Sequence, residues 1–176
     1  MRLRARVDNP IEFRTSGTLF FAQRIMNYWL MKSEPNVFGI DDLAKAPRKT
    51  APWWGVRNYQ ARNFMRDQMA VGDGIFFYHS SCPEPGIAGI AKVSKLAHPD
   101  ETQFDRKSEY FDPKASRDSP RWFNVDVTFV RKTRVLGLPE LKSHAELASM
   151  RVLQRGNRLS ITPVDAHEAE FILKLF

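Results

Sequence analysis

The sequence contains a single cysteine, Cys82, among its 176 residues. One thiol cannot form a disulfide within the chain, and its isolation excludes zinc sites that are built from several cysteines. A lone free cysteine fits a reducing compartment. The sequence also lacks any uninterrupted run of about 18 apolar residues, so we expect no transmembrane helix and no membrane association.

Motifs of cofactor binding and metal binding are missing as well. Neither phosphate-binding motif, GxxxxGK or GxGxxG, occurs in the chain. The four histidines lack the short spacings of metal ligands, and no group of carboxylates surrounds them in the sequence. We therefore expect neither a cofactor nor a metal ion.

Positive charge and aromatic rings are what the chain has in excess. Its 27 lysines and arginines outnumber its 20 acidic residues, which gives a net charge of +7, and 12% of the residues are Phe, Trp or Tyr. A basic balance favours a polyanionic partner. Most of the rings belong in a core, but aromatic and basic residues together are typical of proteins that stack bases and bind phosphates. Nucleic acid, DNA or RNA, is the expected partner.

The composition changes near Met26. Residues 1–25 carry five arginines and two acids and show no hydrophobic periodicity. We interpret them as an N-terminal extension, either disordered or upstream of the working start, with an arginine-rich targeting segment as the weaker alternative. Residues 26–176 show no internal repeat and no Gly/Ser linker, so we expect one domain.

Strand patterns are clearest in two places. Residues 75–79 form a nearly continuous apolar run, as expected of a central strand, which we expect to pair antiparallel with residues 87–93. Residues 122–131 alternate, so that Trp122 and Asn124 share a face opposite the apolar positions. An aromatic ring on a polar face suggests a binding platform. Further strands are predicted at 28–33 and 159–161.

Helix signals alternate with these strands. The spacing of apolar residues predicts a helix over 59–69, and Thr162 is expected to cap a final helix with Pro163 at its first position. Further helices are predicted at 40–45, 138–142 and 145–150. The interleaving predicts the α+β class, with a mixed sheet curled towards a barrel.

Two segments could carry chemistry. His79-Ser80-Ser81-Cys82 places a thiol and two hydroxyls near an imidazole, but neighbouring side chains of a strand point to opposite faces, so we favour a strand end bonded to its own turn. Trp53 lies in a loop, where a large ring must pack inward or line a cavity. Asn58 is either the N-cap of the following helix or a contact to a base edge.

A basic stripe accompanies this aromatic loop. Arg57, Arg62 and Arg66 form a candidate phosphate-binding stripe, although a solvated helix face would have the same pattern. Residues 131–134 and 151–158 add two further basic clusters, so charge alone leaves the phosphate-binding face open.

Three segments resemble the EVE domain family: residues 28–35 (YWLMKSEP), 53–63 (WWGVRNYQARN) and 77–80 (FYHS). The resemblance extends over residues 27 to about 175. Further agreement is found at 86–89, 110–113, 122–130 and 158–161. Trp54 departs from the pattern, because other members usually have an acidic residue there, and this extra ring could change the size of a pocket.

The resemblance implies a PUA-like fold, similar to the YTH domains that hold N6-methyladenine in an aromatic cage. It further implies a reader of a modified base, modified cytosine in DNA being the foremost candidate, without catalysis. We expect three tryptophans, Trp29, Trp53 and Trp122, as walls. The full set of expected pocket residues is Trp29, Lys32, Ser33, Trp53, Asn58, Tyr59, Tyr78, His79, Ser80, Asp112 and Trp122.

Two other functions remain open at this point. Resemblance to the related ASCH domains would imply a small RNA-directed hydrolase, with His79 as general base and Lys32 or an arginine stabilising the charge of the transition state. A protein-interaction module fits the fold but not the charge. We expect a monomer, located in the cytoplasm or, in a eukaryote, in the nucleus.

Overall fold

The computed structural model describes residues 26–176. The predicted N-terminal extension, residues 1–25, therefore lies outside the described residues. Within the described part of the chain, no helix is long and apolar enough to cross a membrane.

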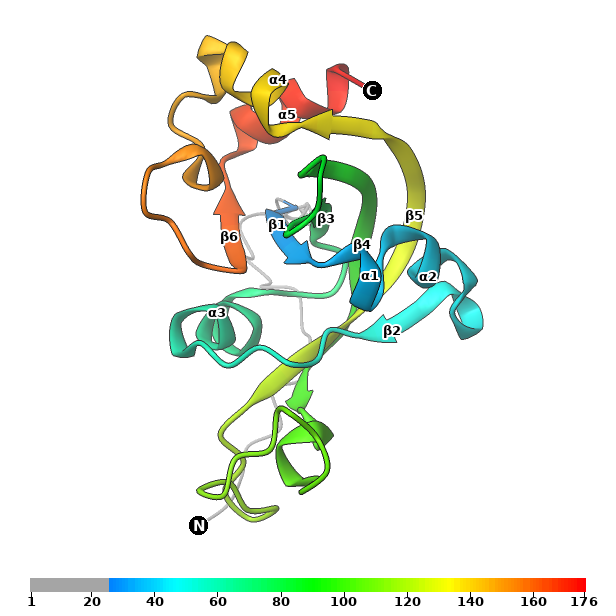
Figure 1. Cartoon of the computed structure of the whole chain (residues 1–176), viewed down its shortest axis with the longest axis vertical. Helices are drawn as coiled ribbons and strands as arrows, with labels where there is room; N and C mark the ends of the chain where they lie inside the picture. The colour runs from blue at the N-terminus through cyan, green and yellow to red at the C-terminus, as the bar shows by residue number, and fades with distance from the viewer. Residues whose placement is uncertain (1–25) are drawn as a thin grey trace, which may run out of the picture.

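A six-stranded mixed sheet forms the centre of the molecule (Figure 1). The parallel pair is β1 with β3, and every other neighbouring pair is antiparallel, including the predicted pairing of β3 with β4. The long strands β4 and β5 shift register several times, and β5 bends around the sheet. In spatial order the strands are β2 (Thr50–Pro52), β5 (Phe123–Gly137), β4 (Gly86–Pro99), β3 (Gly74–His79), β1 (Tyr28–Ser33) and β6 (Ile161–Val164). The α+β class and the mixed, curled sheet are confirmed, and the sheet stays open between its edge strands β2 and β6.

Strands β1 and β3 lie in the middle of the sheet because they are apolar on both faces. Leu30 pairs with Phe76 and Met31 with Phe77, and all four side chains are fully buried. Successive side chains of a strand point to opposite faces, so Leu30 and Phe76 lie on one side of the sheet and Met31 and Phe77 on the other. Two hydrophobic cores result, one on each face of the sheet.

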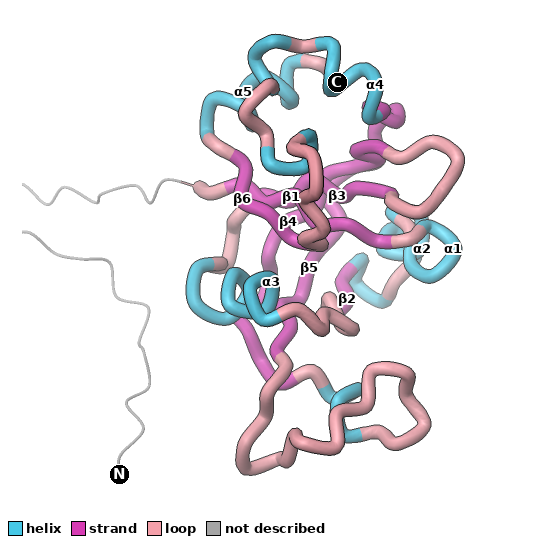
Figure 2. Tube along the Cα trace, turned by 60° about the vertical axis from the view of Figure 1, so that its left-hand side comes forward, coloured by secondary structure: helices cyan, strands magenta, loops and turns pink. Residues whose placement is uncertain are grey.

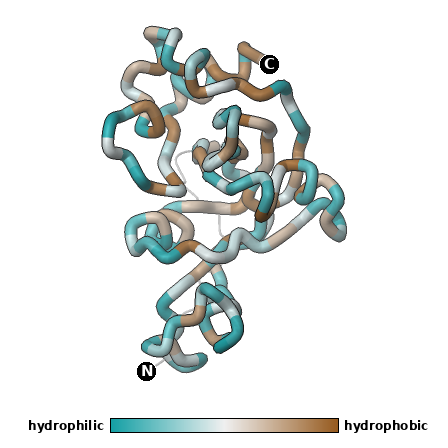
Figure 3. Tube along the Cα trace, in the orientation of Figure 1, coloured by the Kyte–Doolittle hydropathy of each residue, from teal (hydrophilic) through white to brown (hydrophobic). Residues whose placement is uncertain are grey.

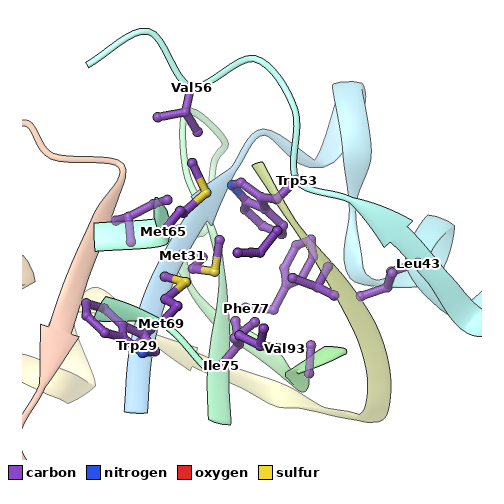
Figure 4. Packing of buried hydrophobic residues seen from close by; sticks show 14 of the residues in the cluster. Trp29, Met31, Leu43, Trp53, Val56, Met65, Met69, Ile75, Phe77 and Val93 are labelled. Carbon is purple, nitrogen blue, oxygen red and sulfur yellow. The ribbon is translucent and has the colours of Figure 1, made fainter. Parts of the chain in front are cut away.

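The larger core lies on the face that carries Met31 and Phe77 (Figure 4). Trp53 enters it from the loop after β2, and Met65 enters it from the helical segment that follows this loop. The other core, around Leu30, is covered by the C-terminal helices at one end of the molecule.

The helical segments are short and lie at the periphery (Figures 1 and 2). The α-helices are α1 (Pro35–Phe38), α2 (Ile40–Lys45), α3 (Tyr59–Asn63, continued by a π-helical turn, Phe64–Gln68), α4 (Leu138–Ser143) and α5 (Ala166–Lys174). Single 3-10 turns lie at Pro47–Lys49, Glu101–Phe104, Ala145–Leu147 and Arg151–Leu153. The predicted helices at 40–45, 59–69 and 138–142 are confirmed, whereas only one 3-10 turn forms within 145–150.

Residues 100–122 form a separate irregular segment at the opposite end from α4 and α5 (Figure 2). The segment is mostly hydrophilic, as Figure 3 shows.

The predicted start of the last helix was wrong. The final helix begins at Ala166 after Asp165, because Thr162 and Pro163 belong to β6, where they pair with Leu30 and Trp29. A proline is tolerated there because β6 is an edge strand. The strand predicted at 159–161 is therefore displaced towards the C-terminus.

The prediction for the polar face of β5 was also wrong. Asn124, expected on a polar surface, is only 3% exposed. At this position β5 pairs with His98 of β4.

Candidate functional site

A pocket of about 540 Å³ opens where β1 and β3 end. Lys32 and Ser33 are the last residues of β1, and Ser80 and Ser81 follow β3. Parallel strands bring their carboxyl ends to one edge of the sheet, which is where ligands bind in many open sheets. The Ser80 amide donates to the Ser33 carbonyl at 2.9 Å and closes this edge. The volume lies in the range of about 300–1,000 Å³ that is usual for small-ligand pockets.

Aromatic side chains wall this β1–β3 pocket. Trp53 and Trp54 come from the loop after β2, Phe38 from α1, and Tyr110 from the irregular segment. The Trp53 ring meets Phe77 edge-on, with centroids 5.1 Å apart, and Trp54 meets Phe38 in the same manner at 5.0 Å. Such contacts fix the orientation of the rings. Trp53 is 6% exposed, so it belongs to the core and to the pocket at once.

Gly55 allows the Tyr110 wall to approach this loop. Its φ of +81° lies in the left-handed region, and a Cβ atom at this position would lie 2.8 Å from Cζ of Tyr110. Both the backbone conformation and the space therefore require glycine. The Gly55 amide donates to Asp100 at 2.9 Å, which anchors the loop to the irregular segment.

Lys32 supplies one of the charged groups of the pocket. Its ammonium is half-buried and has no hydrogen bond or ion pair with any described residue. Burial lowers the pKa of the Lys32 amine. The neighbouring Ser33 hydroxyl donates to the Phe38 carbonyl at 2.7 Å, and its oxygen can still accept. Arg158 and Ser81 add a charge and a hydroxyl at the pocket wall.

Arg57 ties two walls of the pocket together. Its guanidinium donates through Nε to the Tyr110 carbonyl and through Nη1 to the Asp100 carboxylate, both at 2.9 Å. Burial would raise the pKa of Asp100, but hydrogen bonds from Thr102, Arg57 and the Gly55 amide outweigh burial and hold that pKa below its ordinary value. The predicted phosphate ligand Arg57 is thus engaged inside the protein.

A second aromatic group lies beside the pocket, and we call Tyr59 and Trp122 the stacking platform. Their rings stack with centroids 4.9 Å apart and an interplanar angle of 24°. Trp122 donates through Nε1 to the Asp112 carboxylate at 2.7 Å. The Arg57 guanidinium carbon lies 5.3 Å from the Tyr110 ring and 5.4 Å from the Trp122 ring, so one side chain separates the platform from the pocket.

The structure brings four of the expected pocket residues together around the cavity: Lys32, Ser33, Trp53 and Ser80. Three others, Tyr59, Asp112 and Trp122, also meet one another, but at the stacking platform. The role of each in binding stays a prediction.

The remaining four expected pocket residues do not line the cavity. Trp29 and Tyr78 are core residues, and Trp29 donates to Asp73 at 3.1 Å. Asn58 caps α3, since its Oδ1 accepts from the Ala61 amide at 3.0 Å, as the structural alternative predicted. Nε2 of His79 accepts from the Ile40 amide at 3.2 Å, and burial lowers the pKa of His79.

The two other arginines of the predicted stripe differ in their partners. Arg66 forms an ion pair with Asp67 at 2.8 Å. Arg62 donates to the Arg121 carbonyl at 2.7 Å and to the Asn63 side chain, and it forms no ion pair with any described residue. Of the two, Arg62 is the one without an ion pair among the described residues, although the Asp67 carboxylate also attracts its charge.

Sequence reasoning missed several wall residues. Ser81 could have been found from the rule that ligands bind at the carboxyl ends of parallel strands. Phe38, Tyr110 and Arg158 come from segments whose approach to the pocket no local pattern indicates. Trp54 was noted as an extra ring, and the structure places it in the pocket wall.

Metal binding has no counterpart in residues 26–176, where no three His, Cys, Asp or Glu side chains gather in a group that could hold an ion. The pocket offers aromatic faces, hydroxyls, the Lys32 ammonium, the Arg158 guanidinium and the carboxylates of Glu34 and Glu109 instead. Such a set can stack on a planar ring and hydrogen-bond its edge.

Comparison with known proteins identifies the family pattern. The EVE domain model matches residues 27–175. Human thymocyte nuclear protein 1 is 43% identical over 189 residues, which cover 97% of this chain and 83% of that protein. The structure described as human THYN1 protein in complex with 5-methylcytosine-containing DNA is 47% identical, with a TM-score of 0.79 over 85% of this chain and 96% of that one.

A more distant structure confirms the predicted fold. The YTH domain of the Zygosaccharomyces rouxii MRB1 protein is 15% identical and has a TM-score of 0.50 over 86% of each chain. At this identity the likeness concerns the fold alone.

Proposed function

This chain belongs to the EVE domain family, and we propose from that premise that it binds nucleic acid and holds one modified base in the β1–β3 pocket. The human THYN1 protein, 47% identical, is described in complex with DNA that contains 5-methylcytosine. We propose a methylated cytosine in DNA as the first ligand to test.

The observation that carries the proposal is the lining of the pocket. Four aromatic rings surround a cavity in which Lys32 has no partner among the described residues. Bases stack on aromatic faces, and each such contact contributes about 1–3 kcal/mol. Extruding a base from a duplex costs a few kcal/mol, so two or three ring contacts suffice to offset it.

The polar groups at the strand ends would read the edge of the base. An ammonium offers donors only, so Lys32 suits a carbonyl oxygen, a ring nitrogen or a phosphate oxygen. The Ser33 hydroxyl donates to the Phe38 carbonyl and can still accept, whereas the Ser80 hydroxyl can donate or accept, so together they suit an edge that presents both kinds of group.

The hydrolase alternative is weaker than base binding. It requires His79 as general base, yet His79 does not line the pocket and its Nε2 already accepts from the Ile40 amide. A general base must reach the proton that it removes. We therefore propose binding without turnover.

The proposal extends to the cellular location and the oligomeric state of the protein. The human relative is named a nuclear protein, and we propose the nucleus for this chain where the cell has one. The cytoplasmic expectation draws no support from that name. A monomer stays our prediction.

A binding screen tests the function. Short DNA and RNA oligonucleotides, each with one modified base, would be compared with unmodified partners by fluorescence anisotropy at fixed salt. We expect 5-methylcytosine DNA to bind more tightly than its unmodified match. Equal binding of every modified and unmodified pair would contradict the proposal, and cleavage of a labelled strand that disappears in His79→Ala would favour the hydrolase.

A further inference from the structure

The stacking platform presents an exposed ring on a buried one. Tyr59 is 46% exposed, whereas Trp122 beneath it is 6% exposed. The Arg121 guanidinium donates to the Tyr59 hydroxyl, and Asp112 holds the indole nitrogen of Trp122. Both rings are thus fixed at their edges. A ring that is held in place before binding loses little conformational entropy when a ligand stacks on it.

Positive charge lies beside this ring. The Arg62 guanidinium carbon is 4.8 Å from the Tyr59 ring centroid, and Arg62 forms no ion pair with any described residue. Arg121 is partly countered by Asp112 at 3.5 Å. An aromatic face next to a guanidinium that has no ion pair among the described residues has the two groups that a nucleotide requires, one for its base and one for its phosphate.

The Arg57 guanidinium lies between the platform and the pocket. Tyr110 walls the pocket and Trp122 backs the platform, and both rings lie within 5.4 Å of the same Arg57 guanidinium carbon. Stacked nucleotides of one strand are about 3.4 Å apart, and an extended strand spans more. A nucleotide next to one held in the pocket can therefore reach the platform.

We infer that the stacking platform binds the base of a nucleotide that flanks the base in the pocket, with Arg62 contacting its phosphate. This inference rests on the proposed function, because the occupant of the pocket positions the strand. The contact would be insensitive to the identity of the flanking base, since every base has a face that can stack. Tyr59 and Arg62 would then add affinity to modified and unmodified DNA alike.

The test combines a protein variant with a DNA variant. Anisotropy would compare the wild type, Tyr59→Ala and the control Tyr59→Phe on oligonucleotides whose 5′ or 3′ neighbour of the modified base is intact or abasic. We expect Tyr59→Ala to weaken binding to intact DNA by about 5- to 150-fold, the equivalent of one stacking contact. On DNA that is abasic at one of the two neighbours, Tyr59→Ala should cause no further loss, and Tyr59→Phe should bind like the wild type throughout.

The outcomes separate the platform from the pocket. An equal loss by Tyr59→Ala on intact DNA and on both abasic strands, or no loss at all, would overturn the platform while the preference for the modified base stands. If the wild type shows no such preference, the proposed function fails, and the dependence of Tyr59→Ala on the neighbouring base still decides the platform on the same strands. Absence of binding to every strand would overturn both.

Discussion

The β1–β3 pocket and the stacking platform are built from the same kinds of side chain but differ in what those side chains already contact. At the platform, Trp122 and Arg121 use their donors on Asp112 and Tyr59. In the pocket, Lys32 has no partner among the described residues. Residue type alone therefore does not distinguish a specific pocket from a general contact surface, whereas the unused polar groups do.

Trp53→Ala is expected to have the largest effect, and it tests the role of the pocket in recognising the base. Removing a buried ring that serves both core and pocket should lower the free energy of unfolding by about 3–5 kcal/mol and abolish the preference for the modified base. Urea unfolding and anisotropy on matched oligonucleotides measure the two losses.

A matched pair of milder variants separates folding from recognition. Trp29 is as buried as Trp53 but does not line the pocket. Both Trp29→Phe and Trp53→Phe should fold, and only Trp53→Phe should lose preference for the modified base. Full preference in folded Trp53→Phe and folded Trp53→Ala would show that Trp53 is a core residue and no more.

Arg57→Ala would disturb both regions, because its guanidinium lies between their rings. Its loss leaves the buried Asp100 carboxylate without a charged donor, so we expect the free energy of unfolding to fall by about 2–3 kcal/mol near neutral pH. Affinity for modified and unmodified DNA should fall together, as measured by anisotropy on both strands.

The pH dependence of this loss provides its control. The pKa of Asp100 is lower in the folded state than in the unfolded state. The stability that the ionised Asp100 contributes is therefore fully present above the unfolded pKa of about 3.9, and it is lost as the pH falls through the lower pKa of the folded state. The stability gap between the wild type and Arg57→Ala should therefore narrow below about pH 4. A gap that stays constant in acid would exclude the Asp100 pair as its cause.

Lys32→Met tests the free ammonium of the pocket. We expect binding to weaken about tenfold, or about 1.4 kcal/mol, if Lys32 donates to the ligand. Because burial lowers the pKa of Lys32, wild-type affinity should decline as the pH rises through the alkaline range below about 10.4, the ordinary lysine value.

The pH dependence of affinity distinguishes a direct contact of the Lys32 ammonium from an altered pocket shape in Lys32→Met. In Lys32→Met the alkaline decline should be absent, while Lys92→Met, a change of an exposed lysine on β4, should keep the wild-type profile. If the affinity of Lys32→Met declined at alkaline pH as it does in the wild type, a group other than Lys32 would be responsible for the decline.

Much of the fold could be predicted from the sequence because local patterns determine it. The apolar run at β3, the helix over 59–69 and the cap at Asn58 depend on neighbours in the chain. The last helix was predicted to begin too early, because the Thr162-Pro163 signal of a helix start also fits an edge strand paired with β1.

The candidate site was predictable only in part. Lys32, Ser33 and Ser80 lie at strand ends, where the topology gathers them, and Trp53 was marked by its loop. Tyr110 was not found, because an irregular segment carries it to the pocket through Arg57 and Asp100. Such contacts between segments 43 and 53 residues apart in the chain leave no periodic signal.

The smallest expected effect concerns the charge of Arg62 beside the stacking platform, which should alter how binding depends on salt. Arg62 and Arg66 lie close together on one helical segment, yet of the two only Arg66 forms an ion pair with a described residue, Asp67. Each phosphate contact releases about one counterion, so Arg62→Ala should flatten the slope of log affinity against log salt by up to about one unit.

Arg66→Ala is the matched control for that change. Because Asp67 already neutralises Arg66, its removal should change the salt slope by much less than Arg62→Ala does, and the preference for the modified base should stay intact in both variants. Titrations at four or five salt concentrations, on modified and unmodified strands, measure both quantities. Equal flattening of the salt slope by the two variants would mean that the Arg66–Asp67 ion pair opens when DNA binds. A loss of preference for the modified base in Arg62→Ala would mean that Arg62 takes part in recognising the base in the pocket and does not act at the platform alone.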